Sequence, residues 1–165
     1  MEIQSLSKTY KVSRLDETSI PSILRLCDGN PIYYRYAPPA ASKESIEEEM
    51  SALPKGKESK DKYYLGFWDN GKLAAVMDLI VKYPDAKTAW IGFFMMDAAM
   101  QGKGNGSRLI EEICCCLKRD FSFIELGYVK GNLQSEHFWL KNKFHPTGKV
   151  SQTENYEIIV LQRPL

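Results

Sequence analysis

The chain has 165 residues, the usual size of one domain, with 44% hydrophobic and 26% charged residues. Its formal net charge is only +1, which argues against nucleic-acid binding because that function needs a concentrated basic surface. The longest apolar run is far shorter than the roughly 20 residues of a membrane span, and the N-terminal segment lacks the features of a signal peptide. We therefore expect one cytoplasmic domain over residues 1–165, monomeric or homodimeric, that binds neither nucleic acid nor membrane.

The first third of the sequence predicts a strand and two helices. Residues 9–15 alternate as a strand does, and residues 16–29 have the N-cap and the apolar spacing of a helix. Residues 31–41 (PIYYRYAPPAA) are rich in tyrosine and proline and predict a loop. A second helix is expected over 42–53, followed by a charged, mobile linker over 54–62.

The remainder predicts a hairpin, then alternating helices and strands. Asn70-Gly71 is a strong turn signal between strands at 63–68 and 72–83, and the apolar segment 88–96 predicts a central strand. Helices are expected at 106–119 and 132–143, a strand at 121–128, and one or two closing strands between 149 and 161. This order of elements predicts a mixed α/β sheet.

A glycine-rich turn, QGKGNGS, joins the apolar strand to the third helix. Glycines at alternate positions leave backbone N–H groups unobstructed, and the helix places its free N–H groups and positive dipole end at the same point. The turn therefore suits an anion such as phosphate, although a plain connection has the same composition. The spacing matches neither a P-loop nor the GxGxxG dinucleotide motif.

Two motifs resemble the GNAT superfamily, the Gcn5-related N-acetyltransferases. Gln101, Gly104 and Gly106 match its Q/R-x-x-G-x-G/A signature, and NLQSEHFWLKNKF at 132–144 resembles its second motif. The order of elements over nearly the whole chain is also similar. The resemblance implies a mostly antiparallel sheet with one splayed parallel pair and about four flanking helices, and acetyl-coenzyme A (acetyl-CoA) as co-substrate with no metal.

The same resemblance implies a cofactor site. The diphosphate of CoA would lie on the amides of the turn, the pantetheine arm would run along the strand before it, and two residues of the second motif would border the arm. The residues expected to bind the cofactor are Phe94, Met95, Met96, Gln101, Gly102, Lys103, Gly104, Asn105, Gly106, Ser107, Asn132 and Ser135.

The reaction that the resemblance implies, attack of an amine on the thioester, needs a proton acceptor. Asp78 is a candidate because it interrupts a long apolar strand, although it also fits an outward-facing position; Asp97 and Glu125 are further candidates. A tyrosine of the second motif often serves as the acid, but Trp139 stands there. Tyr128 or His137 could substitute, or the thiolate could leave unaided.

The tyrosines of the 31–41 segment fall where this family commonly builds its acceptor site. Tyr33, Tyr34 and Tyr36 are therefore candidate substrate-binding residues, with core packing or a dimer contact as the alternative. The predicted function is acetyl transfer from acetyl-CoA to the amine of a small molecule or peptide. An O-acyltransferase and a non-catalytic CoA-binding sensing module remain the alternatives.

Overall fold

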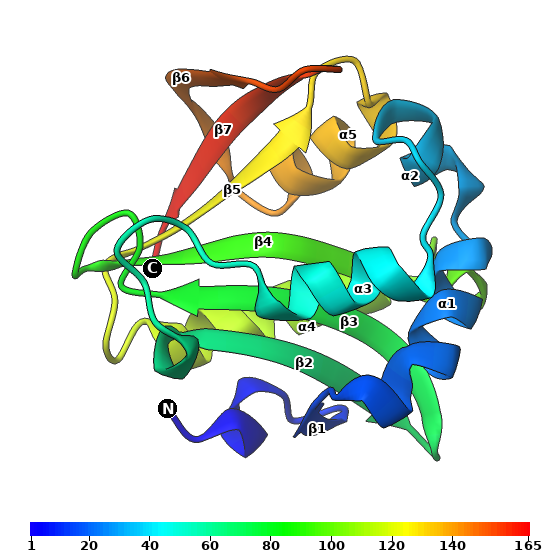
Figure 1. Cartoon of the computed structure of the whole chain (residues 1–165). Helices are drawn as coiled ribbons and strands as arrows, with labels where there is room; N and C mark the ends of the chain where they lie inside the picture. The colour runs from blue at the N-terminus through cyan, green and yellow to red at the C-terminus, as the bar shows by residue number, and fades with distance from the viewer.

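The computed structural model describes all 165 residues, and its centre is one seven-stranded sheet (Figure 1). The strand order is β1-β2-β3-β4-β5-β7-β6, and every neighbouring pair is antiparallel except β4 and β5, which are parallel. The mixed α/β sheet and its single parallel pair are thus confirmed, and the tail forms two strands. The strands are β1 (Lys11–Arg14), β2 (Lys62–Asp69), β3 (Lys72–Val81), β4 (Thr88–Met96), β5 (Phe123–Val129), β6 (His145–Gln152) and β7 (Glu157–Pro164).

Five α-helices flank the sheet, one more than expected. None of them is long and apolar enough to cross a membrane. Four lie within a few residues of the predicted helices, and α2 is the additional one. Short 3₁₀ turns occupy Ile3–Leu6, Glu17–Ser19, Ser59–Asp61 and Ala98–Met100. The helices are α1 (Ile20–Asp28), α2 (Pro31–Tyr36), α3 (Lys43–Ser51), α4 (Asn105–Leu117) and α5 (Leu133–Lys141).

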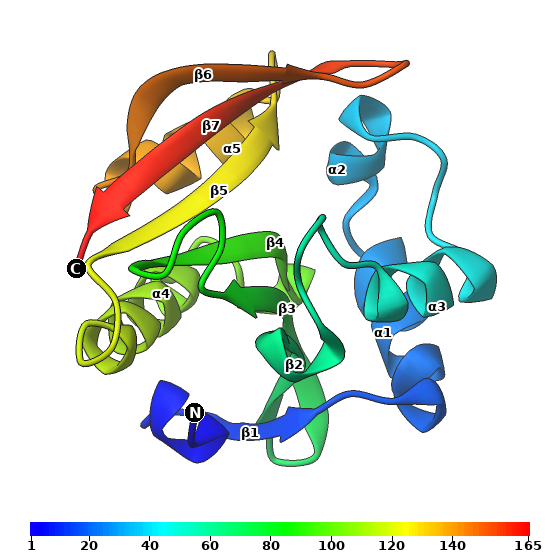
Figure 2. The same cartoon turned by 60° about the vertical axis from the view of Figure 1, so that its left-hand side comes forward.

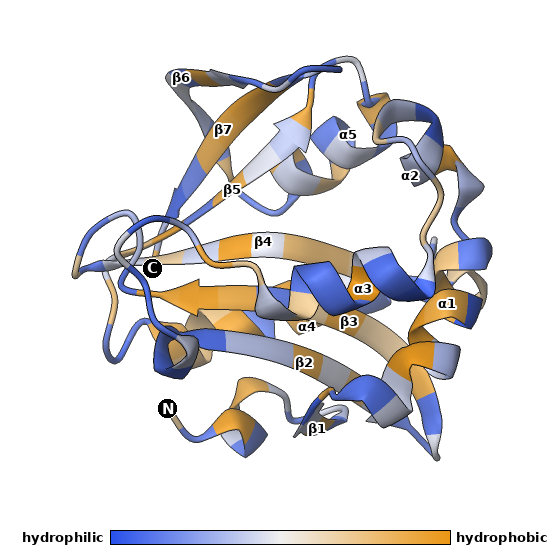
Figure 3. Cartoon of the chain, viewed as in Figure 1, coloured by the Kyte–Doolittle hydropathy of each residue, from blue (hydrophilic) through white to orange (hydrophobic).

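The two faces of the sheet carry separate hydrophobic cores. The larger core packs α4 against strands β2 to β5, with Leu109 and Ile113 at its centre. The smaller core packs α1 and α3 against the opposite face, and it includes Ile23 and Ile46 of the helices with Val76 and Phe93 of the strands. Figure 3 shows apolar residues gathered in the central strands and on the inner sides of these helices. The central strands are therefore covered on both faces, as their nearly continuous apolar sequence requires.

The prediction of a loop over residues 31–41 is wrong for its first half. Pro31–Tyr36 forms helix α2, which begins with proline at a first-turn position. Proline is favoured there because its fixed φ suits a helix and its missing N–H would have no intrahelical partner. The helix ends before Pro38-Pro39, since a residue that precedes proline is disfavoured in helical geometry.

The prediction of a charged linker over residues 54–62 also needs correction. Lys57 pairs with Asp61 at 2.8 Å, and Ser59–Asp61 forms a 3₁₀ turn. Lys62 is the first residue of β2 and is only 5% exposed. Sequence pattern missed this burial because a single lysine next to a charged segment has the composition of a solvated loop.

Strand β4 separates from its parallel neighbour at half its length. Pairing with β5 ends at Ile91↔Leu126, whereas β4 continues to Met96, and the two strands diverge in Figure 2. The Asp97 N–H donates to the Ala74 carbonyl, so the backbone of Asp97 faces β3. Backbone N–H and C=O groups of successive residues in a strand point to alternate sides, so those of Met96 and Phe94 point away from β3. These groups face the gap that opens between β4 and β5.

Candidate active site

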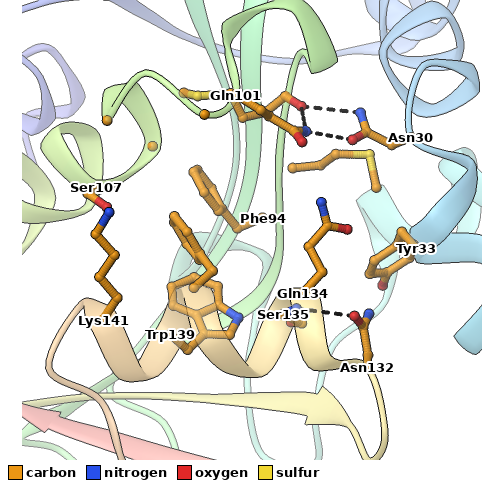
Figure 4. Close-up of a pocket in the computed structure, with 16 residues that line it drawn as sticks. Asn30, Tyr33, Phe94, Gln101, Ser107, Asn132, Gln134, Ser135, Trp139 and Lys141 are labelled. Atoms are coloured by element: carbon orange, nitrogen blue, oxygen red, sulfur yellow. Dashed lines mark hydrogen bonds between the residues drawn. The ribbon is translucent and has the colours of Figure 1, made fainter.

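A cavity of about 320 Å³ lies where β4 and β5 diverge (Figure 4). Its walls come from the junction of α1 and α2, the end of β4, the glycine-rich turn and α5. Ten of the twelve expected cofactor residues line it, and the other two, Lys103 and Asn105, do not. The ten are Phe94, Met95, Met96, Gln101, Gly102, Gly104, Gly106, Ser107, Asn132 and Ser135.

The glycine-rich turn forms one end of this cavity with backbone N–H groups. Gly104 precedes α4 with φ +80°, a left-handed conformation that glycine adopts without strain. The first backbone bond at this end of α4 runs from the Arg108 N–H to the Gly104 carbonyl. The N–H groups of Asn105, Gly106 and Ser107 therefore have no intrahelical acceptor, and with the helix dipole they favour an anion.

The side chains of Lys103 and Asn105 instead stabilise the turn through hydrogen bonds to the backbone that precedes it. The Lys103 ammonium donates to the Ala99 carbonyl at 2.9 Å, and the Asn105 side-chain amide donates to the Met100 carbonyl at 2.9 Å. Both side chains thus bond the 3₁₀ turn before the glycines. Sequence alone could not separate these residues from their neighbours, because side-chain direction in a turn depends on local bonding.

A hydrogen-bond network connects the turn to the junction of α1 and α2. The Gln101 side-chain amide donates to the Met96 carbonyl at 2.8 Å and to Asn30 Oδ1 at 2.7 Å. The Asn30 amide donates in turn to the Met96 carbonyl at 3.2 Å and to the Leu26 carbonyl at 2.8 Å. Because Asn30 directly precedes α2, the network fixes the position of α2 relative to β4 (Figure 4).

Helix α5 forms the opposite wall. Asn132 caps it by accepting from the Ser135 N–H at 3.1 Å. Phe94 of β4 stacks on Phe138, with ring centroids 5.8 Å apart, and this contact supplies an apolar wall. A Cβ at Gly106 would lie 3.1 Å from the Phe138 ring, so the close approach of α4 to α5 favours glycine there.

Six lining residues were not predicted as cofactor ligands: Asn30, Tyr33, Gln134, Phe138, Trp139 and Lys141. Figure 4 shows Lys141 extending from α5 toward Ser107 at the start of α4. A lysine there places a positive charge beside the free N–H groups at the start of α4. No sequence signal pointed to it, because an exposed lysine near the end of a helix is ordinary in sequence.

The candidate base Asp78 lies on β3 opposite Phe93 of β4, and it does not line the cavity. Its outward-facing alternative is wrong, because the residue is only 8% exposed. Oδ2 accepts from the Lys62 ammonium at 2.8 Å, whereas Oδ1 is buried without a hydrogen-bond partner. Desolvation raises the pKa of Asp78, and the bond and charge of Lys62 act in the opposite direction.

A second carboxyl lies near this ion pair. Glu49 of α3 accepts from the Tyr64 hydroxyl at 3.2 Å, and the Lys62 ammonium is 5.9 Å from the Tyr64 ring centroid. Desolvation raises the pKa of Glu49; its bond to Tyr64 opposes this shift, and the charge of Asp78 adds to it. Burial likewise raises the pKa of Tyr64.

The remaining candidates for proton transfer have other partners. Asp97 accepts from the Ala99 N–H at 2.8 Å and caps the 3₁₀ turn, and Glu125 accepts from Gln162 at 2.7 Å. Tyr128 is buried in the larger core and does not line the cavity; burial raises its pKa, and the carboxyl of Glu136 adds to the effect.

The three candidate substrate-binding tyrosines are not equivalent. Tyr33 lines the cavity and packs edge-on against Phe93, with centroids 5.7 Å apart. Tyr34 packs against Tyr33 but lines a separate hollow beside Cys27, and Tyr36 is exposed. Tyr33 therefore is the tyrosine of α2 that reaches the end of the gap between β4 and β5.

A comparison with protein families identifies the relationship. Residues 29–144, which include the whole cavity wall, match the family model described as the acetyltransferase (GNAT) family. The chain belongs to the GNAT family. The chain is therefore an acetyltransferase by family. Members of this family use acetyl-CoA as co-substrate. Among curated proteins no sequence matches the chain.

Solved structures of several acetyltransferases share the fold. An acetyltransferase from Thermus thermophilus superposes with a TM-score of 0.76 at 15% identity, covering 95% of this chain and 97% of that one. An acetyltransferase from Salmonella typhimurium that modifies the N-terminal serine of ribosomal protein L7/L12 gives 0.74 at 17% identity, with 97% of each chain covered. A ribosomal L7/L12 α-N-protein acetyltransferase in complex with CoA gives 0.74 at 19%, covering 99% and 98%. At these identities the similarity establishes the fold.

Proposed function

We propose that the chain is an N-acetyltransferase that moves the acetyl group of acetyl-CoA directly to an amine. The observation that carries the proposal is the cavity between an unpaired strand edge and a helix N-terminus with free N–H groups. Cofactor binding by the ten lining residues follows from the chemistry of CoA. Its diphosphate suits the N–H groups of the turn, and its chain of amides suits the free backbone groups of Phe94 and Met96.

The proposed reaction takes place near Gly92, the one residue of β4 that has no partner where the pairing of β3 and β4 shifts register between Asp78 and Leu79. A backbone N–H that faces the gap stabilises the oxyanion of the tetrahedral intermediate. In this proposal Asp78 accepts the proton of the acceptor, although its side chain does not line the cavity. Tyr128 was a candidate acid, and it too lies outside the cavity lining. Since a thiol has a pKa near 8.5, the thiolate leaves without a dedicated acid in this proposal, and a Tyr128→Phe variant tests that point.

The acceptor in this proposal is the amine of a small molecule or peptide, in the cytoplasm. The Salmonella protein modifies an N-terminal serine, which gives a precedent for an amine acceptor on this fold. Tyr33, at the end of the gap, is the tyrosine that we propose to contact the acceptor.

Thiol release from acetyl-CoA, measured over a panel of amines and alcohols, tests the function. Turnover with an amine, together with a mass increase of one acetyl group on that amine, is the expected result. Turnover with alcohols alone would indicate O-acyl transfer. Binding of CoA without turnover of any acceptor would contradict the proposal and favour a sensing role, for which the tryptophan at 139 gives a reason.

A further inference from the structure

Trp139 of α5 carries a polar group that has no partner within the chain. The residue is only 6% exposed, and three phenylalanine rings pack against its own ring with centroids between 4.9 and 5.8 Å away. Its indole N–H makes no hydrogen bond, whereas the indole N–H of Trp68 donates to Ser13 Oγ at 2.8 Å. A buried indole N–H usually has an acceptor, so a free one points to a partner outside the chain.

The free N–H reaches the cavity. Asp78 Oδ1 is the only side-chain oxygen or nitrogen that is sealed from solvent without a partner, so the Trp139 nitrogen borders open space. Trp139 lines the cavity, and Figure 4 shows the indole nitrogen on the side of the ring that faces Ser135, another lining residue. Within α5, Trp139 is the only buried residue of the lining. A nearly buried donor is thus aimed into the floor of the cavity.

The place of Trp139 along β4 indicates which part of a cofactor it meets. The start of α4, which holds the diphosphate in the proposed function, lies at the end of β4, where a Cβ on Gly106 would be 3.7 Å from Met96 Sδ. From there β4 runs back past Phe94 to Ile91, where pairing with β5 closes the gap. The Trp139 ring packs against the Phe94 ring with centroids 5.8 Å apart. An arm that is anchored at α4 and laid along β4 therefore brings its far end, with the sulfur, to Trp139.

We infer that the indole N–H of Trp139 donates a hydrogen bond to the sulfur of CoA and stabilises the thiolate as it leaves. The inference rests on the proposed function and adds to it a donor for the leaving group. β4 supplies backbone N–H groups to the carbonyl oxygen from one wall, and Trp139 meets the sulfur from the opposite wall. A hydrogen bond to the sulfur strengthens as negative charge develops there, so it favours the transition state over the bound thioester.

The donor keeps its own proton throughout the step. The amine nitrogen bonds to the thioester carbon, the C–S bond breaks with its electron pair on sulfur, and the nitrogen releases one proton through the base to solvent. The thiolate then takes one proton from solvent, so that one amine and one acetyl-CoA give one amide and one CoA thiol. Because an indole N–H is only a donor, Trp139 stabilises the thiolate by a hydrogen bond and not by proton transfer.

The titratable groups around Trp139 offer no acid for the thiolate. Only Tyr33 and Lys141 are titratable among the lining residues. Desolvation raises the pKa of Tyr33, which makes it a poor proton donor, and Lys141 extends toward Ser107 at the diphosphate end (Figure 4). Tyr128 of β5 belongs to the same core as Trp139 but does not line the cavity. The rings that pack against Trp139 from β4, from α5 and from the segment after α5 are all phenylalanines.

The test measures the pKa of the CoA thiol in the bound state, which needs no turnover. Ultraviolet absorbance follows thiolate formation over a pH series, as the difference between protein loaded with CoA and protein loaded with desulfo-CoA. A donor to the sulfur stabilises the thiolate, so the bound thiol should have a pKa about one to two units lower in the wild type than in Trp139→Phe. Trp90→Phe is the matched control and should leave the thiol pKa unchanged, because Trp90 packs against Tyr83 and does not line the cavity.

Turnover should show the same loss in kcat and not in binding. We expect Trp139→Phe to lower kcat by about 10- to 100-fold, while calorimetry shows CoA affinity changed less than about threefold at a pH where the thiol is protonated. If this variant fails to fold, Trp139→benzothienylalanine keeps the shape of the ring and replaces the N–H by sulfur.

The outcomes separate this inference from the proposed function. Equal thiol pKa values in the wild type and in the variants that lack the N–H would overturn the inference, even if turnover fell. A shifted thiol pKa without turnover of any amine would support the contact with sulfur and contradict the proposed function. Failure of CoA to bind would overturn both.

Discussion

The two sides of β4 present different kinds of polar groups. On the α4 and α5 side the polar groups are mainly backbone N–H groups and uncharged side chains, held by turns and caps of local sequence. On the α1 and α3 side the polar groups are charged side chains from β2, β3 and α3, far apart in sequence. Backbone donors suit a constant ligand such as a diphosphate, whereas side chains can change with the acceptor. In the proposed function, the first side binds the cofactor that the whole family uses, and the second side contacts the acceptor that is particular to this chain.

The largest effect on the cofactor side is expected from Gly104→Glu. The new carboxylate would lie among the free N–H groups and repel a diphosphate, so calorimetry should show CoA affinity lower by about 10- to 100-fold. Gly56→Glu is a matched control, because Gly56 has a similar φ of +83° and nothing within 4 Å of its Cβ position. Equal affinity in the two variants would remove the distinction between a phosphate site and an ordinary turn.

A smaller effect on the same side is expected from Lys141→Met. The lysine reaches into the cavity from α5 but remains exposed, so its charge is screened. We expect CoA affinity to fall about 3- to 10-fold at low salt and less at high salt. Lys72→Met, an exposed lysine at the β2–β3 hairpin, should change nothing; the same loss in both variants would indicate a non-specific charge effect.

Tyr33 tests whether the two sides act independently. Tyr33→Ala removes a ring between α2 and Phe93, and the Michaelis constant for the amine should rise about 5- to 20-fold, in line with lost aromatic contacts. CoA affinity should change less than about twofold, since the turn and α5 remain intact. If CoA affinity fell as much as amine affinity, Tyr33 would contribute to cofactor binding as well, and the two sides would not act independently. Tyr36→Ala is the control, because Tyr36 is exposed.

The connection between the sides is testable through Asn30 and Gln101. Asn30→Ala and Gln101→Ala each remove a donor from the Met96 carbonyl, and each should lower the free energy of unfolding by about 1 kcal/mol. Because the side chains also bond one another, the double variant should lose less than the sum of the single variants. Additive losses in chemical denaturation would show that the network does not couple α2 to β4.

The smallest effect is expected from Tyr128→Phe. Tyr128 lies in the larger core beside α5 and not in the cavity, so removal of its hydroxyl should lower kcat less than about threefold if the thiolate leaves unaided. A loss of about 100-fold or more, with CoA affinity unchanged, would instead identify Tyr128 as the general acid.

The contrast between the sides also explains what sequence could predict. The glycine-rich turn, the caps and the order of strands are local patterns, and they indicated the fold and ten residues that line one cavity. The burial of Lys62 and its pairing with Asp78 depend on the register of β2 and β3, where Tyr64 faces Asp78. Helix α2 was missed because two prolines follow it and tyrosine is more typical of strands than of helices, while the contact of Tyr33 with Phe93 holds the segment against the sheet. Contacts between distant segments leave little trace in one sequence.

A crystal structure of the chain grown with CoA tests the central claim most directly. We expect the diphosphate over the amides of residues 101–107, the pantetheine arm between β4 and β5, and the sulfur near Gly92. CoA bound elsewhere, or a diphosphate distant from the start of α4, would contradict the proposed site and the acetyl transfer derived from it.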